Sequence, residues 1–380
     1  MIVGVTRETA PGERRVALIP ETAEKLVRSG VGVIVEHGAG ERAFHSDDSY
    51  TKAGASIAAD AREVYAKSHL VLHARRPASE TLELMRDGTV VIAPLQPLSN
   101  PDLVRRLAER RVTAFSTDAI PRIARAQALD VLSSMASIAG YVAVLTAARS
   151  LPKFFPLMMT AAGTLTPARV FVIGAGVAGL QAIATARRLG AVVEAFDTRP
   201  VVKEQVQSLG ASFIEATLGA ADTEDKGGYA KELSEDAHRR ELELVASRAR
   251  EADVVITTAL IPGRRAPILI TGDTVRAMRS GSVIVDLAGE QGGNCELSRP
   301  GETVVENGVT IHAPLDLASS MPVHASQMLS RNHAALLQLL IKDGALALNF
   351  EDEVVREACI THEGKIVHDR AREVAEGRSA

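Results

Sequence analysis

A glycine-rich turn constrains the fold of this chain more than any other feature of the sequence. A strand-like apolar run leads into Gly174, Gly176 and Gly179, which open an alanine-rich helical pattern over residues 177–189. In this GxGxxG spacing, the first glycine permits a tight turn, the second lets the backbone approach a pyrophosphate, and the third lets helix and strand pack closely. A second apolar run then ends at Asp197. Strand, turn, helix, strand and carboxylate together predict a unit that binds a dinucleotide.

The residues around this turn indicate which dinucleotide is bound. The carboxylate of Asp197 is placed to accept hydrogen bonds from the adenosine ribose hydroxyls and to repel a 2′-phosphate, which favours NAD(H) over NADP(H). The helix N-terminus offers unpaired N–H groups to the phosphates. We therefore expect the cofactor to contact Val177 and Ala178 at the start of the helix, and Thr198 and Arg199 directly after the carboxylate.

The length and patterning of the chain predict two α/β domains. At 380 residues the chain is too long for one ordinary core. Strand and helix patterns alternate through residues 2–116 and again from residue 169 onward, which is typical of parallel sheets covered by helices. We expect two Rossmann-like, doubly wound parallel-sheet domains with a ligand cleft between them. Two long helical patterns, at residues 126–149 and 325–342, are expected to link the domains.

The second long helix is expected to return the chain to its first domain. That domain then comprises residues 1–133 plus 322–380 and has no dinucleotide fingerprint, whereas the NAD(H)-binding domain comprises residues 134–321. An insertion at about residues 218–243 interrupts the second domain where a strand should pass directly to a helix. Such long insertions are typical of lids and binding loops. Tyr229, preceded by two glycines, would suit a mobile, hinged cover over the nucleotide, and a disordered polar insertion is the alternative.

Composition argues against several other functions. A net charge of −4 and an aromatic content of 3%, with no Trp, give no basic field and no stacking platform for nucleic acid. Cys295 and Cys359 are too few and too far apart for a disulfide framework, which fits a cytoplasmic protein. We find no secretory signal and no apolar run that approaches the ~20 residues needed to span a bilayer, so no direct membrane insertion is expected. Neither an HExxH motif nor paired cysteines indicate a metal site.

An unusual polar cluster lies at residues 121–134 (PRIARAQALDVLSS). Gln127, Asp130 and Ser134 follow helical spacing, and Ser133 comes three residues after Asp130. A nicotinamide carboxamide and its ribose need a planar amide partner, a carboxylate or hydroxyl acceptor, and an arginine. The cluster supplies all three through Gln127, Asp130 with Ser133, and Arg122. A helix N-terminus with a solvated face is the alternative interpretation.

Glycine-rich and polar turns also follow two later strand patterns. In open α/β sheets the carboxyl ends of the strands face the ligand crevice, so these turns are expected to contact the cofactor. Asp286 could equally cap its own loop, and we give it no catalytic role. From these turns we assign to the cofactor site Thr258, Ala259, Leu260, Glu290 and Asn294.

The sequence lacks a local acid/base near these clusters. No histidine occurs between His73 and His238. A dehydrogenase of hydroxy or amino acids normally needs such a group for the proton that accompanies hydride. Hydride exchange between two nicotinamides needs only close alignment of two C4 atoms.

At this point the chain is identified as resembling a known family over essentially its whole length. Besides PRIARAQALDVLSSMASIAGY and VIGAGVAGLQA, it carries in order the phrases FDTRP, KEQVQSLGA, GGYAK, TTALIPG and VDLAGEQGGNC. These motifs resemble the NAD(H)-binding alpha-1 subunit of bacterial proton-translocating nicotinamide nucleotide transhydrogenase. The resemblance implies that Arg122, Gln127, Asp130 and Ser133 contact the nicotinamide and that Tyr229 belongs to a mobile loop.

The resemblance also implies the reaction and the partners. The expected reaction is reversible hydride transfer between NADH and NADP⁺, coupled to proton translocation across the membrane. NADP(H) would be bound on a partner subunit. The expected assembly is a homodimer that docks onto membrane-spanning and NADP(H)-binding subunits. The chain would therefore be cytoplasmic and peripherally associated with the inner membrane.

Two alternatives remain open on the sequence. Alanine dehydrogenases resemble this chain, including Glu8 and the phrase from Arg15 to Glu21, but they carry a lysine and a histidine for their substrate. Here Arg75 stands about where the lysine belongs, and no histidine follows in the stretch 93–101, to which we assign no role. A non-catalytic NAD-sensing module is the other alternative, and it would not need the cluster that positions a nicotinamide.

Overall fold

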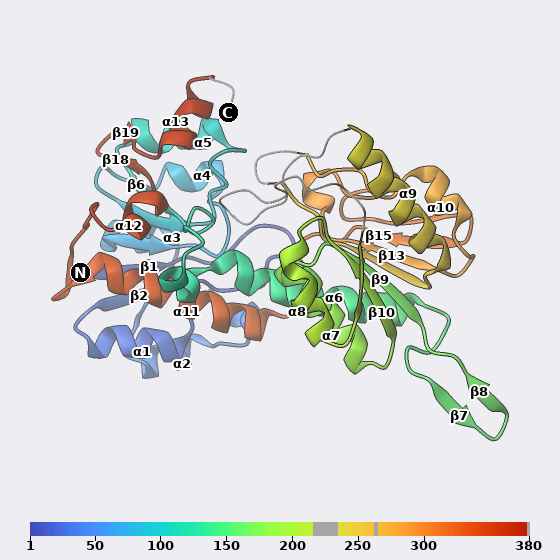
Figure 1. Cartoon of the computed structure of the whole chain (residues 1–380). Coiled ribbons are helices and arrows are strands. Elements are labelled where there is room, and N and C mark those ends of the chain that lie inside the picture. Colours follow the sequence, from blue (N-terminus) through green and yellow to red (C-terminus); the bar gives the residue numbers. More distant parts are fainter. Residues whose placement is uncertain (216–234, 262–264, 378–380) are drawn as a thin grey trace. The chain divides into compact units, whose positions relative to one another are not determined.

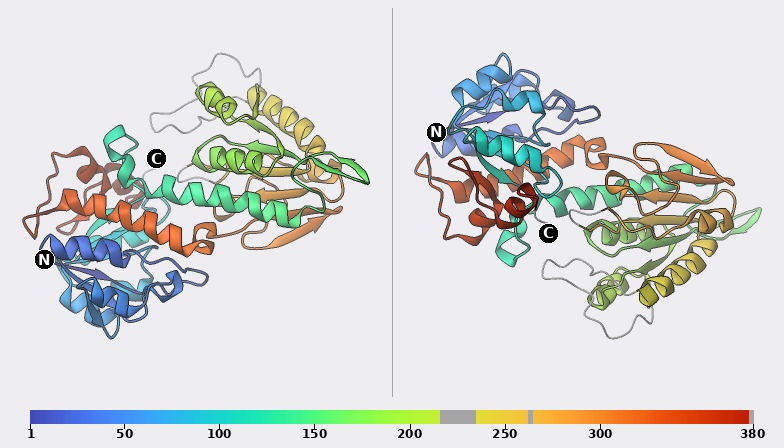
Figure 2. Two further views of the ribbon diagram at one scale, coloured as in Figure 1. Left: turned by 90° about the horizontal axis from the view of Figure 1, so that it is seen from below. Right: turned by 90° about the horizontal axis from the view of Figure 1, so that it is seen from above.

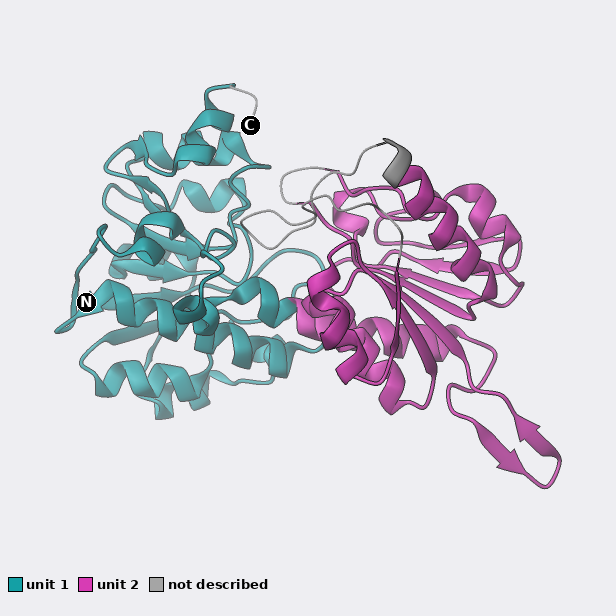
Figure 3. Ribbon diagram, viewed as in Figure 1, with its two compact units in different colours: residues 1–135, 319–380 teal, residues 136–318 magenta. Residues whose placement is uncertain are grey.

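The computed structural model describes residues 1–215, 235–261 and 265–377 (Figure 1). The chain divides into two compact units (Figure 3). Unit 1 comprises Met1–Met135 and Ser319–Ala380, and unit 2 comprises Ala136–Ala318. Each unit is built around its own mostly parallel sheet, so the predicted α/β fold class with two doubly wound sheets is confirmed.

Unit 1 contains an eight-stranded sheet. Its strands lie in the order β19-β18-β6-β5-β4-β1-β2-β3, and the six strands from β1 to β6 are parallel. The strand order reverses between β1 and β4, which is the type of position where open sheets bind ligands. The strands are β1 (Ile2–Val5), β2 (Gly32–Glu36), β3 (Ser56–Ala58), β4 (Leu70–Leu72), β5 (Val90–Ala93), β6 (Thr113–Ser116), β18 (Cys359–His362) and β19 (Lys365–Ile366). A separate hairpin pairs β16 (Ile341–Lys342) with β17 (Ala345–Leu346).

Helices cover both faces of this sheet because its strands are apolar on both sides. Leu70 and Leu72 point into one buried cluster, which includes α11, and Val71 points into the other. Burying each such side chain stabilises the fold by roughly 1.5–3 kcal/mol. Helix α11 lies beside α1 on the first face (Figure 2). The helices of unit 1 are α1 (Pro20–Arg28), α2 (Asp47–Lys52), α3 (Ala61–Lys67), α4 (Ser79–Leu82), α5 (Pro101–Glu109), α11 (Pro322–Leu340), α12 (Glu353–Ala358) and α13 (Asp369–Ala375), with 3-10 turns at Glu41–Ala43 and Ala124–Leu129.

Unit 2 contains a seven-stranded sheet in the order β11-β10-β9-β12-β13-β15-β14, in which only β14 is antiparallel to its neighbour. The order reverses between β9 and β12, and β9 is the strand that leads into the glycine turn. The strands are β9 (Arg169–Ile173), β10 (Val192–Phe196), β11 (Ser212–Ile214), β12 (Val254–Thr257), β13 (Val283–Asp286), β14 (Thr303–Glu306) and β15 (Val309–His312). The helices are α7 (Val177–Arg188), α8 (Lys203–Ser208), α9 (Glu235–Glu251) and α10 (Gly272–Ala277), with 3-10 turns at Pro200–Val202 and Gly289–Gln291 and a further one, Leu317–Ser320, at the boundary with unit 1.

Helix α6 (Val131–Ser150) corrects one expectation from the sequence. Among the described residues it is the one helix long and apolar enough to cross a membrane, so the expectation that no run reaches that length was wrong. Its apolar side chains have another use, because Ala143, Val144 and Ala147 are fully buried in the core of unit 2. A Cβ on Gly140 would lie 2.0 Å from the carbonyl oxygen of Ala178, so the two helix backbones are in close contact.

The helix predicted over residues 126–149 is also wrong at its beginning. A 3-10 turn ends at Leu129, Asp130 has a non-helical ψ of 87°, and α6 starts only at Val131. Gln127 and Ser134 therefore do not lie on one continuous helical face with Asp130. The physical reason is that the Asp130 side chain caps the new helix, which competes with continuing the previous turn.

A hairpin of β7 (Met158–Thr160) and β8 (Gly163–Leu165) extends from unit 2 away from its sheet (Figure 1). Every residue of both strands is exposed. Met159 has 79% of its surface accessible, and Leu157 just before the hairpin has 54%. Large apolar side chains gathered in this way are typical of interaction surfaces.

Candidate functional site

The three glycines of the turn have three different surroundings. Gly174 has a φ of +95°, in the region that favours glycine, and its N–H donates to the carbonyl oxygen of Phe196 at 2.8 Å. A Cβ on Gly179 would lie only 1.8 Å from the carbonyl oxygen of Gly174. A Cβ on Gly176 would meet no atom within 4 Å. Gly174 and Gly179 thus serve the fold, and Gly176 leaves open space at the N-terminus of α7.

Parallel register brings the predicted carboxylate to this turn. Phe196 of β10 pairs with Ile173 of β9, so Asp197 follows directly beside Gly174. One oxygen of Asp197 accepts from the N–H of Ala175 at 2.7 Å. Because β10 ends where β9 turns, the side chain lies at the carboxyl edge of the sheet, where ligands bind in open α/β sheets.

Arg199 holds the same carboxylate. Its Nε donates to Oδ1 of Asp197 at 2.9 Å, its Nη2 donates to Oδ2 at 2.8 Å, and its backbone N–H donates to Oδ1 at 2.8 Å. The side chains of Asp197 and Arg199 are 5% and 15% exposed, so water screens this pair little. The sequence indicated both residues but not that they bind each other.

The turn after β12 is tied to the glycine turn and to the turn after β13. The hydroxyl of Thr258 donates to the carbonyl oxygen of Gly174 at 3.1 Å. Asn294 is fully buried and pairs with both backbone groups of Ala259: its Oδ1 accepts from the N–H at 3.0 Å, and its Nδ2 donates to the carbonyl oxygen at 2.9 Å. Leu260 and Glu290 are exposed near the same edge.

Asp286 organises the turn that carries Asn294. It is fully buried, and its oxygens accept from the hydroxyls of Thr257 and Ser298 and from three backbone N–H groups, those of Ala288, Asn294 and Cys295. A buried carboxylate is tolerated when hydrogen bonds satisfy it in this way. Asp286 therefore acts as the loop-capping residue that the sequence left as one option.

The predicted nicotinamide cluster lies in unit 1, where α6 begins. Oδ1 of Asp130 accepts from the N–H of Ser133 at 2.8 Å, and the Ser133 hydroxyl donates to Oδ2 at 2.6 Å. Arg122 and Gln127 are exposed. The structure thus brings Asp130 and Ser133 into direct contact as a helix cap and leaves the guanidinium and the amide accessible on the preceding turn.

Two contacts far apart in sequence anchor this turn, and sequence reasoning missed both. The guanidinium of Arg125 donates to both carboxylate oxygens of Asp352, at 2.9 and 2.7 Å. The Nδ2 of Asn332 donates to the carbonyl oxygen of Ala128 at 2.8 Å. Asp352 also caps α12, and the Arg125 guanidinium lowers its pKa to about 2. Only the spacing of Arg125 within the polar cluster could have drawn attention to the first pair.

The predicted cover segment is largely outside the described residues. Tyr229 lies there, so its role stays a prediction. Residues 235–243, however, form the first half of α9, so the expectation that the insertion extends to residue 243 was wrong. In that helix His238 Nδ1 lies 3.0 Å from a carboxylate oxygen of Glu241, and burial raises the pKa of Glu241.

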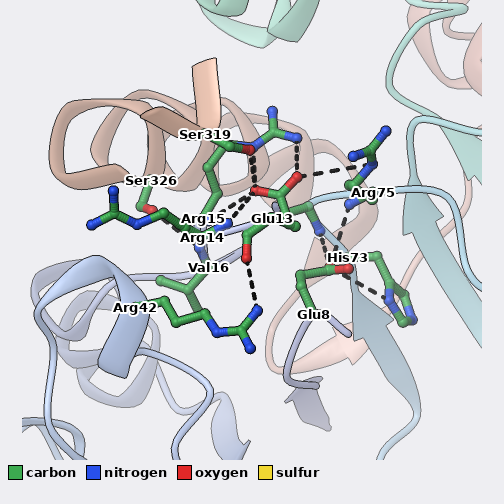
Figure 4. A network of polar contacts seen from close by, with 11 residues as sticks. Glu8, Glu13, Arg14, Arg15, Val16, Arg42, His73, Arg75, Ser319 and Ser326 are labelled. Carbon is green, nitrogen blue, oxygen red and sulfur yellow. Dashed lines mark hydrogen bonds and ion pairs between the residues drawn. The ribbon is translucent and has the colours of Figure 1, made fainter. Parts of the chain in front are cut away.

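A second polar cluster occupies unit 1 around Glu13 (Figure 4). The fully buried carboxylate of Glu13 binds the Arg15 guanidinium through both oxygens, at 2.8 and 2.6 Å, and accepts from the Ser319 hydroxyl at 2.6 Å. Burial alone would raise the pKa of Glu13, but Arg15 and Ser319 outweigh it and lower the pKa to about 2. Arg75 approaches the same carboxylate, with its Nε 3.9 Å from Oε2.

Glu8 and His73 continue this cluster toward the strand ends. Oε1 of Glu8 accepts from the N–H of Ala74 at 2.6 Å, and the His73 ring bonds through Nε2 to the Tyr65 hydroxyl at 2.7 Å. Burial raises the pKa of Glu8 to about 7 and lowers that of His73 to about 4. Within the described parts of the chain, no group of three His, Cys, Asp or Glu side chains could hold a metal ion.

Comparisons with known proteins agree with this arrangement. The alanine dehydrogenase/PNT N-terminal domain matches residues 4–139, and the alanine dehydrogenase/PNT C-terminal domain matches residues 143–369. The chain is 46% identical over 376 residues to an NAD(P) transhydrogenase alpha subunit of Rhodospirillum rubrum, with 97% of this chain and 98% of that protein covered. It belongs to the NAD(P) transhydrogenase alpha-subunit family.

Solved structures place the transhydrogenase family beside its relatives. The transhydrogenase from Sinorhizobium meliloti has a TM-score of 0.84 at 41% identity and covers 97% of this chain and 99% of its own. An L-alanine dehydrogenase has the same TM-score at 26% identity and covers 100% of both chains. The two share the fold equally, and sequence identity separates them. The prediction of the transhydrogenase family is confirmed.

Proposed function

We propose that this chain binds NAD(H) for a proton-translocating transhydrogenase. In this function hydride passes reversibly between NADH and NADP⁺, the latter bound on a partner subunit, and the transfer is coupled to proton movement across the membrane. The observation that carries the proposal is the open space at Gly176 beside Asp197. A Cβ there would meet nothing within 4 Å, whereas the glycines on either side are packed against backbone. The match to an NAD(P) transhydrogenase alpha subunit over nearly the full chain supports it.

The residues present fit a dinucleotide in two halves. The pyrophosphate would lie against Gly176 and the first turn of α7, and the adenosine ribose would lie against Asp197. The nicotinamide would be held by Arg122, Gln127 and the Asp130–Ser133 cap. Bound NADH supplies the hydride. The protein groups orient the ring and move no proton, which fits the absence of histidine between His73 and His238.

The test adds the full chain to membranes that carry the other transhydrogenase subunits. NADPH-dependent reduction of an NAD⁺ analogue should be restored by the native chain. Gln127→Ala should lower the rate while the Kd for NADH stays unchanged, because the adenosine half is held elsewhere. Asp253→Asn is the matched control, since Asp253 accepts from the Arg169 N–H at the opposite edge of the unit 2 sheet. Absence of restoration by the native chain would reject the function.

The same preparation separates the two alternatives. An alanine dehydrogenase would reduce NAD⁺ with alanine in the absence of membranes. An NAD-sensing module would bind NADH and restore no transfer. The Glu13 cluster bears on the first alternative, because Glu13 already engages Arg15 and lies close to Arg75. We expect no alanine-dependent turnover.

We further propose that the chain acts as a homodimer and is held at the cytoplasmic membrane through its partner subunits. The exposed β7–β8 hairpin supports the dimer, because its apolar side chains need cover. A groove at its base is lined in part by Phe154, Pro156 and Leu189. Sedimentation of Met159→Asp should show monomer, whereas Val305→Asp, a control at an exposed apolar residue of β14, should remain dimeric. A dimeric Met159→Asp variant would contradict this assignment.

A further inference from the structure

The contacts of Asp197 leave it saturated. Its two oxygens accept from four donors, which are the N–H groups of Ala175 and Arg199 and the Nε and Nη2 atoms of Arg199. A carboxylate has about four lone-pair positions, so these donors use all of them. A ribose hydroxyl can bond to Asp197 only by replacing one of these contacts. Arg199 is the donor that can leave, because it is a side chain, whereas the N–H of Ala175 belongs to the glycine turn.

The position of Arg199 has a chemical consequence for cofactor choice. In sites that bind 2′-phosphorylated dinucleotides, an arginine near the end of the second strand receives the 2′-phosphate. Arg199 lies two residues after Asp197 and has the required charge and planar donors. In this structure that charge is compensated by the bidentate contact with Asp197, whose side chain is only 5% exposed.

We propose that Arg199 is a specificity-determining residue, a latent 2′-phosphate ligand that Asp197 withholds from NADP(H). This inference rests on the proposed function, in which this edge of unit 2 binds the adenosine ribose. A 2′-hydroxyl can donate to Asp197 in place of one guanidinium N–H. A 2′-phosphate has no donor to offer, and it would have to displace the carboxylate from Arg199 while lying beside its negative charge.

The proposal explains how one chain can carry an arginine at this position and still prefer NAD(H). Such a preference matters for a two-nucleotide reaction, because NADP(H) bound in both places would exchange hydride without net transfer. Glu241 contributes in the same direction. Its carboxyl lies near enough to interact electrostatically with Asp197, and when ionised it adds negative potential at the place where a 2′-phosphate would lie.

The experiment measures Kd for NADH and for NADPH with the full chain and four variants. The variants are Asp197→Asn, Arg199→Gln, the double variant Asp197→Asn/Arg199→Gln, and the control Asp253→Asn. The native chain should prefer NADH. Asp197→Asn keeps an oxygen for the Ala175 N–H but no longer pairs Arg199 as an ion, so NADPH should bind at least about tenfold more tightly than to the native chain. The double variant should lose that gain, and the control should behave as native.

The outcomes distinguish this inference from the proposed function. A native chain that fails to bind NADH rejects the proposed function itself. Normal NADH binding, with NADPH affinity equal in Asp197→Asn and in the double variant, overturns the role of Arg199 alone. Asp197→Ser provides the same comparison where the asparagine variant fails to fold. Competition by adenosine 2′-phosphate against adenosine gives a second readout, since the two probes differ only in the phosphate and both lack the nicotinamide.

Discussion

Adding one methyl group at two neighbouring glycines should separate binding from folding. At Gly176, φ is −73° and ψ is −168°, which an alanine adopts without strain, and the new Cβ meets no atom within 4 Å. Alanine is a poorer N-cap than glycine, but it also restricts the unfolded chain. These effects oppose each other, so Gly176→Ala should change the free energy of unfolding by less than about 1 kcal/mol.

At Gly179 the same methyl group meets backbone. Its Cβ would lie 1.8 Å from the carbonyl oxygen of Gly174 and 2.8 Å from the carbonyl carbon, so helix and turn must separate by roughly 1 Å. Overpacking of this kind typically costs about 1–3 kcal/mol, and a backbone neighbour places it at the upper end. For a unit of this size, a loss of about 3 kcal/mol lowers Tm by roughly 6–12 °C.

The assays are thermal unfolding followed by circular dichroism and NADH binding measured by titration below the lower Tm. Gly176→Ala should unfold like the native chain and bind NADH at least about tenfold more weakly, because the methyl group occupies the space kept for the pyrophosphate. Gly179→Ala should show the large loss of stability. Each variant controls for the other. Native NADH affinity in a folded Gly176→Ala chain would refute the assignment of that space to the cofactor.

Three further predictions follow from contacts of the described residues. Asp352→Asn should loosen the turn held by Arg125 and lower kcat with little change in the Kd for NADH, and restored kcat in the exchanged pair Arg125→Asp/Asp352→Arg would show that the ion pair is responsible; an unchanged kcat would contradict it. Asn294→Ala should lower the free energy of unfolding by about 2 kcal/mol, since a buried N–H and C=O of Ala259 lose their partner, and denaturant titration that shows no loss would refute this. Glu8 has its pKa raised to about 7, so the native state favours its protonated form, and the free energy of unfolding should fall by on the order of 3 kcal/mol as the pH rises from about 4.5 to about 7; Glu8→Gln should abolish that fall in denaturant titrations at pH 5 and pH 8, and an equal fall in both proteins would contradict it.

The sequence by itself determined the features that depend on local backbone chemistry. The glycine spacing and the apolar runs on either side of it specify strand, turn and helix, because left-handed backbone and close packing both require glycine. Alternating strand and helix patterns likewise predicted the two parallel sheets. The helix start at Asp130 was missed, because helical spacing alone does not reveal that a side chain caps a new helix.

Tertiary structure alone decided which groups meet across the chain. Asp352 binds Arg125 from 227 residues away, and Ser319 binds Glu13 from 306 residues away, with no signal in either segment. The same holds for α6, whose composition fits a membrane span and whose side chains pack in the core of unit 2. Hydrogen bonds and burial depend on distances that chain folding sets, so the state of a residue such as Arg199, bound to Asp197 rather than available to a phosphate, is visible only in the folded protein.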